Sequence, residues 1–155
     1  MTPNPNLLRI IGRVGRELST GFDAQLKGLG LTSARARVLL QLVRSPEGVS
    51  QAAVTEFLGV EHPTAVRILD GLESLGHIRR EPAPHDRRAK LIMLTDAGRP
   101  LAEQVGVLTD GLNAQLLDGL SADDVATTNR ILTILLERIE ALKPPVSDEL
   151  GERVS

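Results

Sequence analysis

The feature that most constrains the fold is a basic stretch, Asp86-Arg87-Arg88-Ala89-Lys90, between two short apolar runs. The run before it ends at the strand breakers Pro82 and Pro84, and the run after it, Leu91-Ile92-Met93-Leu94, leads into a helix-start signal at Thr95-Asp96. A strand, an exposed basic loop and a returning strand fit this order of residues. We therefore predict a β-ribbon that holds residues 86–90 out at its tip.

The rest of the chain has mainly helical periodicity. From Leu7 to Leu29 apolar residues recur every three or four positions, which predicts one long amphipathic helix. From Val125 to Leu142 the spacing alternates between three and four residues, which is the heptad seam of a helix that packs against another helix. The expected helices have these start and stop signals: Leu7 to Gly28 and Gly30; Thr32 or Ser33 to Ser45-Pro46-Glu47-Gly48; Ser50 to Gly59; Glu61 to Gly76; Leu101 to Gly119; and Ser121 to Pro144-Pro145.

The third and fourth of these helices are short, and Leu58-Gly59-Val60-Glu61 joins them. Two short helices connected by a four-residue turn that contains glycine form a helix-turn-helix. With the β-ribbon after it, this arrangement predicts a winged helix-turn-helix. The fold class is therefore expected to be mainly α (α+β), with the N- and C-terminal helices forming a dimerisation domain.

Charge is unevenly distributed along the chain, whose formal net charge is −2. Residues 1–94 contain 13 Lys and Arg against 9 Asp and Glu, a balance of +4, whereas residues 95–155 contain 5 against 11, a balance of −6. Binding to a polyanion depends on a local patch of charge rather than on the total. The N-terminal part is therefore suited to nucleic acid.

The composition argues against several other classes of protein. The chain has 41% hydrophobic and 25% charged residues, as soluble globular domains do. It has no cysteine and only three histidines, so we expect no disulfide, no metal and no cofactor. No apolar run approaches the roughly 20 residues of a membrane span. The polar N-terminus is no signal peptide, so we expect a cytoplasmic, nucleoid-associated protein without a membrane partner.

The exposed face of the predicted helix 61–76 offers the first candidate DNA contacts. In a helix-turn-helix, residues near the start of the second helix reach base edges. Arg67 suits guanine or a phosphate, and Thr64 and His62 can form hydrogen bonds or a phosphate contact. The alternative is a solvated helix face, with which the acidic Glu61 agrees.

The basic tip offers the second set of candidates. Arg88 suits the narrow minor groove, Asp86 can orient Arg88 by a charge-assisted hydrogen bond, and Arg87 and Lys90 would lie over phosphates. The alternative is a hairpin whose charges serve only solubility. The helix-turn-helix upstream favours DNA. The full set of DNA-binding candidates is His62, Pro63, Thr64, Arg67, Arg79, Arg80, Asp86, Arg87, Arg88 and Lys90.

The two end helices predict a homodimer. Packing their apolar stripes against the same helices of a second copy would bury both stripes and place two winged helices on one face of DNA. An intrachain bundle is the alternative. We expect residues 1–30 and 100–145 to form the helical dimerisation region, 31–99 the winged helix-turn-helix, and 146–155 a flexible tail. The expected interface residues are Leu7, Ile11, Leu132, Leu135, Ile139 and Leu142.

We find no nucleophile motif, no paired catalytic carboxylates and no phosphate-binding glycine loop, so an enzyme is not expected. Two other functions stay open besides DNA binding. One is a winged-helix protein–protein interaction module that binds an acidic partner. The other is a ligand-binding protein with a vestigial DNA-binding part.

These motifs resemble the MarR family of bacterial transcription regulators, most closely its SlyA/RovA branch, over about Leu7 to Leu142. The resemblance implies a homodimeric winged-helix repressor, or an activator by antirepression, that binds pseudopalindromic double-stranded DNA. On that pattern Arg67 and Thr64 read the major groove, Arg88 reads the minor groove, and Asp86 supports the wing. The motifs that carry it are Leu31-Thr32, the residues from Gly59 to Glu73, Gly76-His77-Ile78-Arg79-Arg80, the stretch Asp86 to Lys90, and Leu94-Thr95-Asp96-Ala97-Gly98.

The resemblance also implies a small aromatic carboxylate as effector, in a cleft between the dimer helices and the winged helix. Arg13 and Arg16 on the first helix align with basic positions of the SlyA branch and could face such an anion, as could Arg67 from the far side. The alternative for Arg13 and Arg16 is a solvated helix face. The chain has no Trp or Tyr and only Phe22 and Phe57, so it lacks the aromatic side wall of some relatives.

Overall fold

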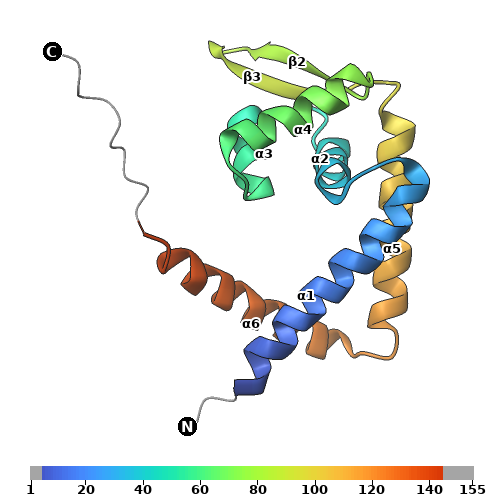
Figure 1. Cartoon of the computed structure of the whole chain (residues 1–155), viewed down its shortest axis with the longest axis vertical. Helices are drawn as coiled ribbons and strands as arrows, with labels where there is room; N and C mark the ends of the chain where they lie inside the picture. The colour runs from blue at the N-terminus through green and yellow to red at the C-terminus, as the bar shows by residue number, and fades with distance from the viewer. Residues whose placement is uncertain (1–4, 145–155) are drawn as a thin grey trace, which may run out of the picture. The chain divides into compact units, whose positions relative to one another are not determined.

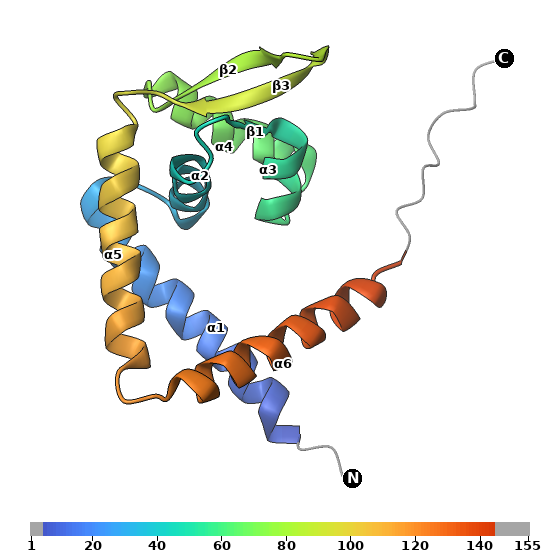
Figure 2. The same ribbon diagram turned by 180° about the vertical axis from the view of Figure 1, so that it is seen from behind.

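Helices make up most of the chain, and a three-stranded sheet packs against three of them (Figures 1 and 2). The computed structural model describes residues 5–144 and confirms the predicted fold class, a mainly helical winged helix-turn-helix. In chain order the elements are α1 (Pro5–Leu26), η1 (Lys27–Leu29), α2 (Ser33–Val43), β1 (Val49–Ser50), α3 (Gln51–Leu58), α4 (His62–Ser74), β2 (Ile78–Ala83), β3 (Asp86–Leu94), α5 (Arg99–Leu117) and α6 (Ala122–Ala141).

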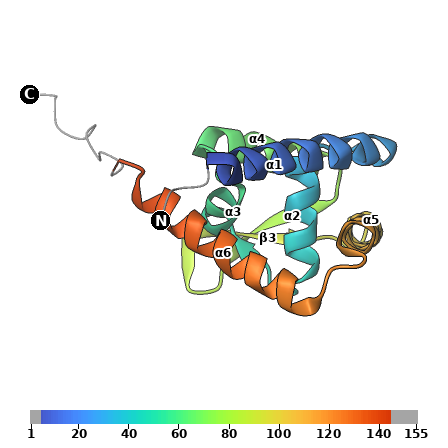
Figure 3. The same cartoon turned by 90° about the horizontal axis from the view of Figure 1, so that it is seen from below.

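A single apolar core holds together the unit that extends to Leu112. Leu39, Leu69 and Ile92 are completely buried, so the core joins α2, α4 and β3. Helix α2 lies between α3 and the first turns of α5 (Figures 1 and 3). Ala102, also completely buried, brings these turns of α5 into the same core. The helix-turn-helix and the sheet are therefore parts of one folded unit.

The sheet is antiparallel in the order β1-β3-β2, and β1 is a strand that the sequence did not predict. Its two residues pair with the part of β3 that lies away from the turn, Val49 with Ile92 and Ser50 with Leu91. A two-residue strand is too short for the alternating pattern by which strands are recognised in a sequence. Ser50 also caps α3 as expected, because its side chain accepts a hydrogen bond from Ala53 N at 3.1 Å.

The basic stretch 86–90 lies in β3, which corrects the prediction of an exposed loop there. The turn is made by residues 84–85, and β2 continues through Pro82. Because β2 is an edge strand of the sheet, it tolerates a residue without a backbone N–H. The register then shifts, since Pro82 pairs with Lys90 but Ala83 pairs with Asp86, which leaves residues 87–89 without Cα partners. The two tip arginines therefore occupy a β-bulge rather than a turn.

The junction between β3 and α5 differs slightly from the prediction. Thr95 Oγ1 donates a hydrogen bond to the Gly76 carbonyl at 2.6 Å and accepts one from Gly98 N at 3.0 Å. These bonds form a turn, so α5 begins at Arg99 rather than directly after Thr95. Gly98 is required at this point, because a Cβ there would lie 2.8 Å from the carbonyl carbon of His77 and 2.9 Å from its Cα.

The second unit contains the end of α5 and helix α6, which begins where it was predicted to begin. The Ser121 side chain accepts a hydrogen bond from Asp124 N at 3.1 Å, and Asp123 and Asp124 in the first turn suit the helix dipole. No residue of α6 is buried. None of the helices within residues 5–144 has the length and apolar character needed to cross a bilayer. The predicted tail, 146–155, lies outside the described residues.

Candidate nucleic-acid interface

Helix α4 has one apolar side in the core and its other side in solvent. Ala65, Leu69 and Leu72 are completely buried, and their spacing of three and four residues puts them on one side of the helix. Arg67 and the candidates at the N-terminal turn lie outside this apolar side and remain accessible. His62, Pro63 and Arg67 are exposed, and Thr64 is half-buried.

Helix α3 fixes where α4 begins. Gly59 ends α3 with a φ of 64°, in the left-handed region where glycine is favoured, and its N–H bonds back to the carbonyls of Thr55 and Glu56. Val54 and Leu58 anchor α3 in the core. The turn then delivers the chain to the first residues of α4, as a helix-turn-helix requires.

Strands β2 and β3 form the wing. At its tip, Asp86 holds the backbone of the bulge. Its Oδ1 accepts a hydrogen bond from Arg88 N at 2.9 Å. This differs from the prediction, in which Asp86 orients the guanidinium of Arg88 directly. Because the carboxylate bonds the main chain, it shapes the bulge and leaves the exposed Arg88 side chain free to extend.

Four cations lie on α4 and the wing tip without an internal partner: Arg67, Arg87, Arg88 and Lys90. Within residues 5–144 none of their side chains forms a hydrogen bond or an ion pair with the protein. All four are exposed. Exposed cations without acidic partners are available to an external anion, and phosphates of nucleic acid are one such anion.

Arg79 and Arg80, at the base of the wing, have partners within the protein. Arg79 Nε lies 2.6 Å from Glu81 Oε1, and its Nη1 lies 3.5 Å from the Leu94 carbonyl oxygen. The Arg79 side chain is half exposed, so it still faces solvent beside its carboxylate partner.

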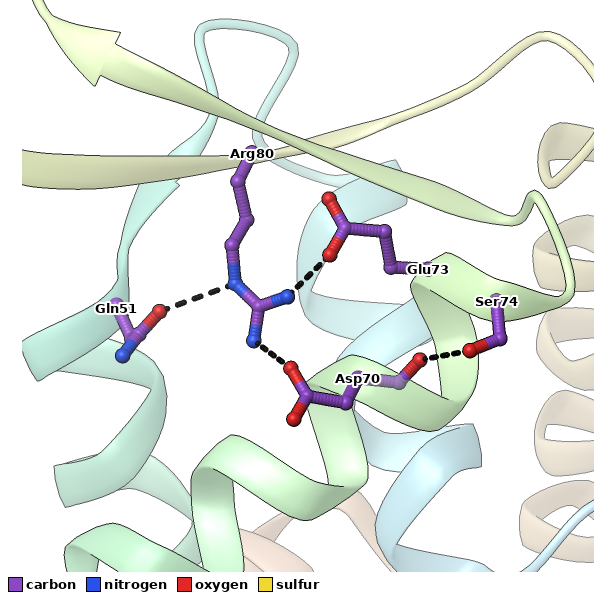
Figure 4. A network of polar contacts seen from close by, with 5 residues as sticks. All are labelled: Gln51, Asp70, Glu73, Ser74 and Arg80. Carbon is purple, nitrogen blue, oxygen red and sulfur yellow. Dashed lines mark hydrogen bonds and ion pairs between the residues drawn. The ribbon is translucent and has the colours of Figure 1, made fainter.

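Arg80 is held more completely, by three residues from two helices (Figure 4). Its Nε donates to Gln51 Oε1 at 3.2 Å, its Nη2 to Asp70 Oδ1 at 2.8 Å, and its Nη1 to Glu73 Oε2. Only 16% of the side chain is exposed. Arg80 was predicted to contact DNA, but in this structure its guanidinium is engaged by partners within the protein.

Sequence reasoning missed Gln51, Asp70 and Glu73 as part of this site. One signal was present, because the carboxylates of Asp70 and Glu73 are three residues apart and so lie on neighbouring turns of one helix face. Their partner could not be identified, since Arg79 and Arg80 are adjacent and point to opposite faces of a strand. Gln51 carried no signal at all, because its contact spans 29 residues.

The effector candidates on α1, Arg13 and Arg16, are both exposed. Neither forms a hydrogen bond or an ion pair with another residue of the described range 5–144. Phe22 is partly buried against the core from the same helix, and the second aromatic residue, Phe57, lies on α3. The structure does not bring Arg13 or Arg16 into contact with Arg67.

Known proteins share both the motifs and the fold. The family model described as "MarR family" matches residues 29–89. The transcriptional regulator PA3341 is 33% identical, with 86% of this chain and 97% of that chain covered and a TM-score of 0.78. A mutant MarR from E. coli, crystallised with operator DNA, is 30% identical, with 85% and 94% covered and a TM-score of 0.72.

A third relative has been solved with a ligand. CouR from Rhodococcus jostii RHA1, bound to p-coumaroyl-CoA, is 28% identical, with 81% of this chain and 88% of that chain covered and a TM-score of 0.75. The matched family model spans the helix-turn-helix and most of the wing, and the alignments with solved relatives extend over most of the chain. The chain therefore belongs to the MarR family of winged-helix transcription regulators, as its motifs predicted.

Proposed function

We propose that this regulator is a homodimer of SlyA type that binds a pseudopalindromic operator. The observation that carries the proposal is the set of unpartnered cations on α4 and the wing tip: Arg67, Arg87, Arg88 and Lys90. The related MarR, which is 30% identical, was crystallised with operator DNA, and this supports DNA as the partner of this chain. Each copy would insert α4 into a major groove and its wing into the adjacent minor groove.

In the major groove, Arg67 is the main candidate for base contact. Its side chain is exposed one turn beyond the start of α4, and a free guanidinium can bond guanine O6 and N7 together. Thr64 and His62 precede it and offer hydrogen bonds, and the exposed Pro63 stands in the first turn of the helix. In the proposal Thr64 reads the major groove beside Arg67, while His62 and Pro63 serve orientation and phosphate contact.

In the minor groove, Arg88 is the inserting residue. The hydrogen bond from its N–H to Asp86 fixes the bulge from which the side chain extends, and a narrow minor groove attracts an arginine electrostatically. Arg87 and Lys90 flank it as phosphate contacts, and Arg79 adds a weaker one because Glu81 already neutralises part of its charge.

The dimer is proposed from apolar side chains that one copy leaves uncovered. Helix α6 carries the heptad seam and has no buried residue, and Ile139 is 53% exposed. Leu7 on α1 is 47% exposed. A second copy would cover residues 1–30 and 100–145, while 31–99 would remain the DNA-binding part. The proposed interface contains Leu7, Ile11, Leu132, Leu135, Ile139 and Leu142.

DNA binding is tested by selecting genomic fragments on the purified protein and measuring affinity for the recovered sequence across a salt series. We expect a pseudopalindromic site and a slope of log affinity against log salt of about −0.9 for each phosphate contacted. Recovery of no preferred sequence, together with equal affinity for unrelated DNA, would overturn the proposal. Salt-independent binding to an acidic protein would instead favour an interaction module.

We further propose a small aromatic carboxylate or its thioester as effector. The ligand-bound CouR structure supports this ligand class, and Arg13, Arg16 and Arg67 are the cations that would face the anionic group. The test compares salicylate, p-coumarate and p-coumaroyl-CoA by thermal shift and by release of the selected DNA fragment. An effector must raise the melting temperature and release DNA, and Arg13→Ala with Arg16→Ala must weaken both responses.

A further inference from the structure

Arg80 joins the first strand of the wing to both helices of the helix-turn-helix. It extends from β2, the first strand of the wing, and bonds Asp70 and Glu73 on α4 and Gln51 at the start of α3 (Figure 4). Each of its three guanidinium nitrogens has a separate partner, from residues 7, 10 and 29 positions away in sequence. The rigid, forked guanidinium fixes direction as well as distance, which a lysine ammonium does not.

The two acidic partners need an explanation on a helix that is proposed to enter the major groove. Asp70 and Glu73 belong to the proposed recognition helix, and their side chains are 58% and 41% exposed. Carboxylates on a helix in the major groove repel the phosphates on either side. Their position is explained if their function is to bond the wing rather than the DNA.

We propose that Arg80 is a positioning residue that sets the wing at a fixed angle to α4, so that Arg88 and Arg67 reach neighbouring grooves at the same time. This inference rests on the proposed function, because it assigns Arg80 a role within that DNA-binding surface. Arg80 itself does not touch DNA. Its mostly buried side chain, 16% exposed, ties the base of the wing while the tip stays free.

The first test is a double-mutant cycle between Arg80→Met and Arg88→Ala, measured as affinity for the selected operator fragment. Arg80→Met alone is expected to weaken binding about tenfold, as the loss of one specific arginine contact does. In the Arg88→Ala background, Arg80→Met is expected to lower operator affinity by less than about twofold, because the wing no longer contributes a contact that needs positioning. Arg130→Met, on α6, is the control for loss of one positive charge.

The second test separates positioning from phosphate contact by changing charge. Arg80→Lys keeps the charge but cannot make three directed bonds, so it is expected to weaken binding nearly as much as Arg80→Met. Asp70→Asn combined with Glu73→Gln removes two negative charges from the DNA face. Simple electrostatics predicts tighter binding for that variant, whereas the positioning role predicts weaker binding.

Each variant is also followed by thermal melting and by hydrogen exchange of the β2–β3 segment in the free protein. A loss of melting temperature that explains the affinity change in both Arg88 backgrounds would overturn the inference in favour of a general structural role. The inference would also be overturned by two results together: Arg80→Lys retains wild-type affinity, and the salt slope of Arg80→Met is about 0.9 smaller than that of the wild type. That combination marks a direct phosphate contact. Failure of the wild-type protein to bind any fragment would overturn the proposed function itself, so the two failures are distinguishable.

Discussion

The proposed DNA-binding part, residues 31–99, and the end helices, α1 and α6, differ in how completely one copy of the chain buries their apolar side chains. In the first region Leu39, Leu69 and Ile92 are inaccessible to solvent. In the second, Leu136 of α6 is 66% exposed, and Leu142, the residue directly after α6, is 83% exposed. Exposed apolar stripes of this extent on monomeric proteins mark interaction surfaces. The contrast shows that one copy suffices to bury the core of the proposed DNA-binding part, and it supports the proposal that a second copy covers the end helices.

The largest effect is expected from introducing charge into the seam of α6. Leu135→Glu combined with Ile139→Glu would bury two carboxylates in a dimer interface, so the chain should become monomeric. Losing the second DNA-binding part should weaken operator binding between about 100- and 10,000-fold, the usual gain from bivalency. Sedimentation and operator titration measure the two effects.

Thr133→Glu is the control for added negative charge, because it introduces one carboxylate on α6 at an exposed position outside the seam. It should stay dimeric and bind operator as the wild type does. A double Glu variant that remained dimeric at micromolar concentration would show that the contrast between the two regions has another cause, such as an intrachain bundle.

The next largest effect is expected inside the DNA-binding part, at Gly98. A Cβ there would overlap the backbone of His77 at the junction of α4 and β2, and backbone cannot move as a side chain can. Gly98→Ala should therefore lower the free energy of unfolding by about 2–4 kcal/mol, comparable to severe overpacking. Chemical denaturation measures this change, and a loss below the error of the method would contradict the contact.

Arg88→Ala should have an intermediate effect that is confined to binding. The side chain has no partner within the described residues, so its removal should leave the melting temperature unchanged. Operator affinity should fall about tenfold, as for one specific arginine contact. Unchanged affinity would mean that the wing tip, though exposed and cationic, does not face DNA.

A smaller effect of opposite sign is expected in α1. Nothing lies within 4 Å of a Cβ placed on Gly15 or Gly21. Because alanine is the better helix former, Gly15→Ala and Gly21→Ala should each stabilise the chain by about 0.5–1 kcal/mol. If either change instead weakened the dimer, the glycine would mark a point where the two copies approach closely, which would sharpen the comparison further.

The sequence was sufficient to predict the helices because their apolar periodicity and their caps are local signals. Ser50 and Ser121 cap α3 and α6 as expected, and Gly59 ends α3. The same locality explains the errors at the wing. Pro84 lies in the turn, as a strand breaker should, but Pro82 lies within β2. Whether a proline is tolerated there depends on the strand lying at the sheet edge, which is a property of the whole fold.

The candidate site was predictable to the same extent. Arg67, Arg87, Arg88 and Lys90 are exposed as expected, since they stand outside the apolar pattern. The adjacent Arg79 and Arg80 look alike in the sequence, yet one faces mainly solvent and the other a cluster of Gln51, Asp70 and Glu73. Only the pairing register of β2 and the packing of α3 against α4 decide between them.

The smallest effect is expected at Gly71, in the middle of α4. A Cβ there would meet the Arg35 guanidinium of α2, 3.0 Å from Cζ and 3.3 Å from Nε, so the obstacle is the end of a flexible side chain rather than backbone. Gly71→Ala gains about 1 kcal/mol of helix propensity but displaces Arg35, and the net change should lie within about 0.5 kcal/mol of zero. In an Arg35→Ala background the same substitution should stabilise by the full amount, about 1 kcal/mol. A loss of stability as large as that expected for Gly98→Ala would mean that the Arg35 side chain is held as firmly as backbone. Packing of this cation would then stabilise the proposed DNA-binding part together with the apolar core.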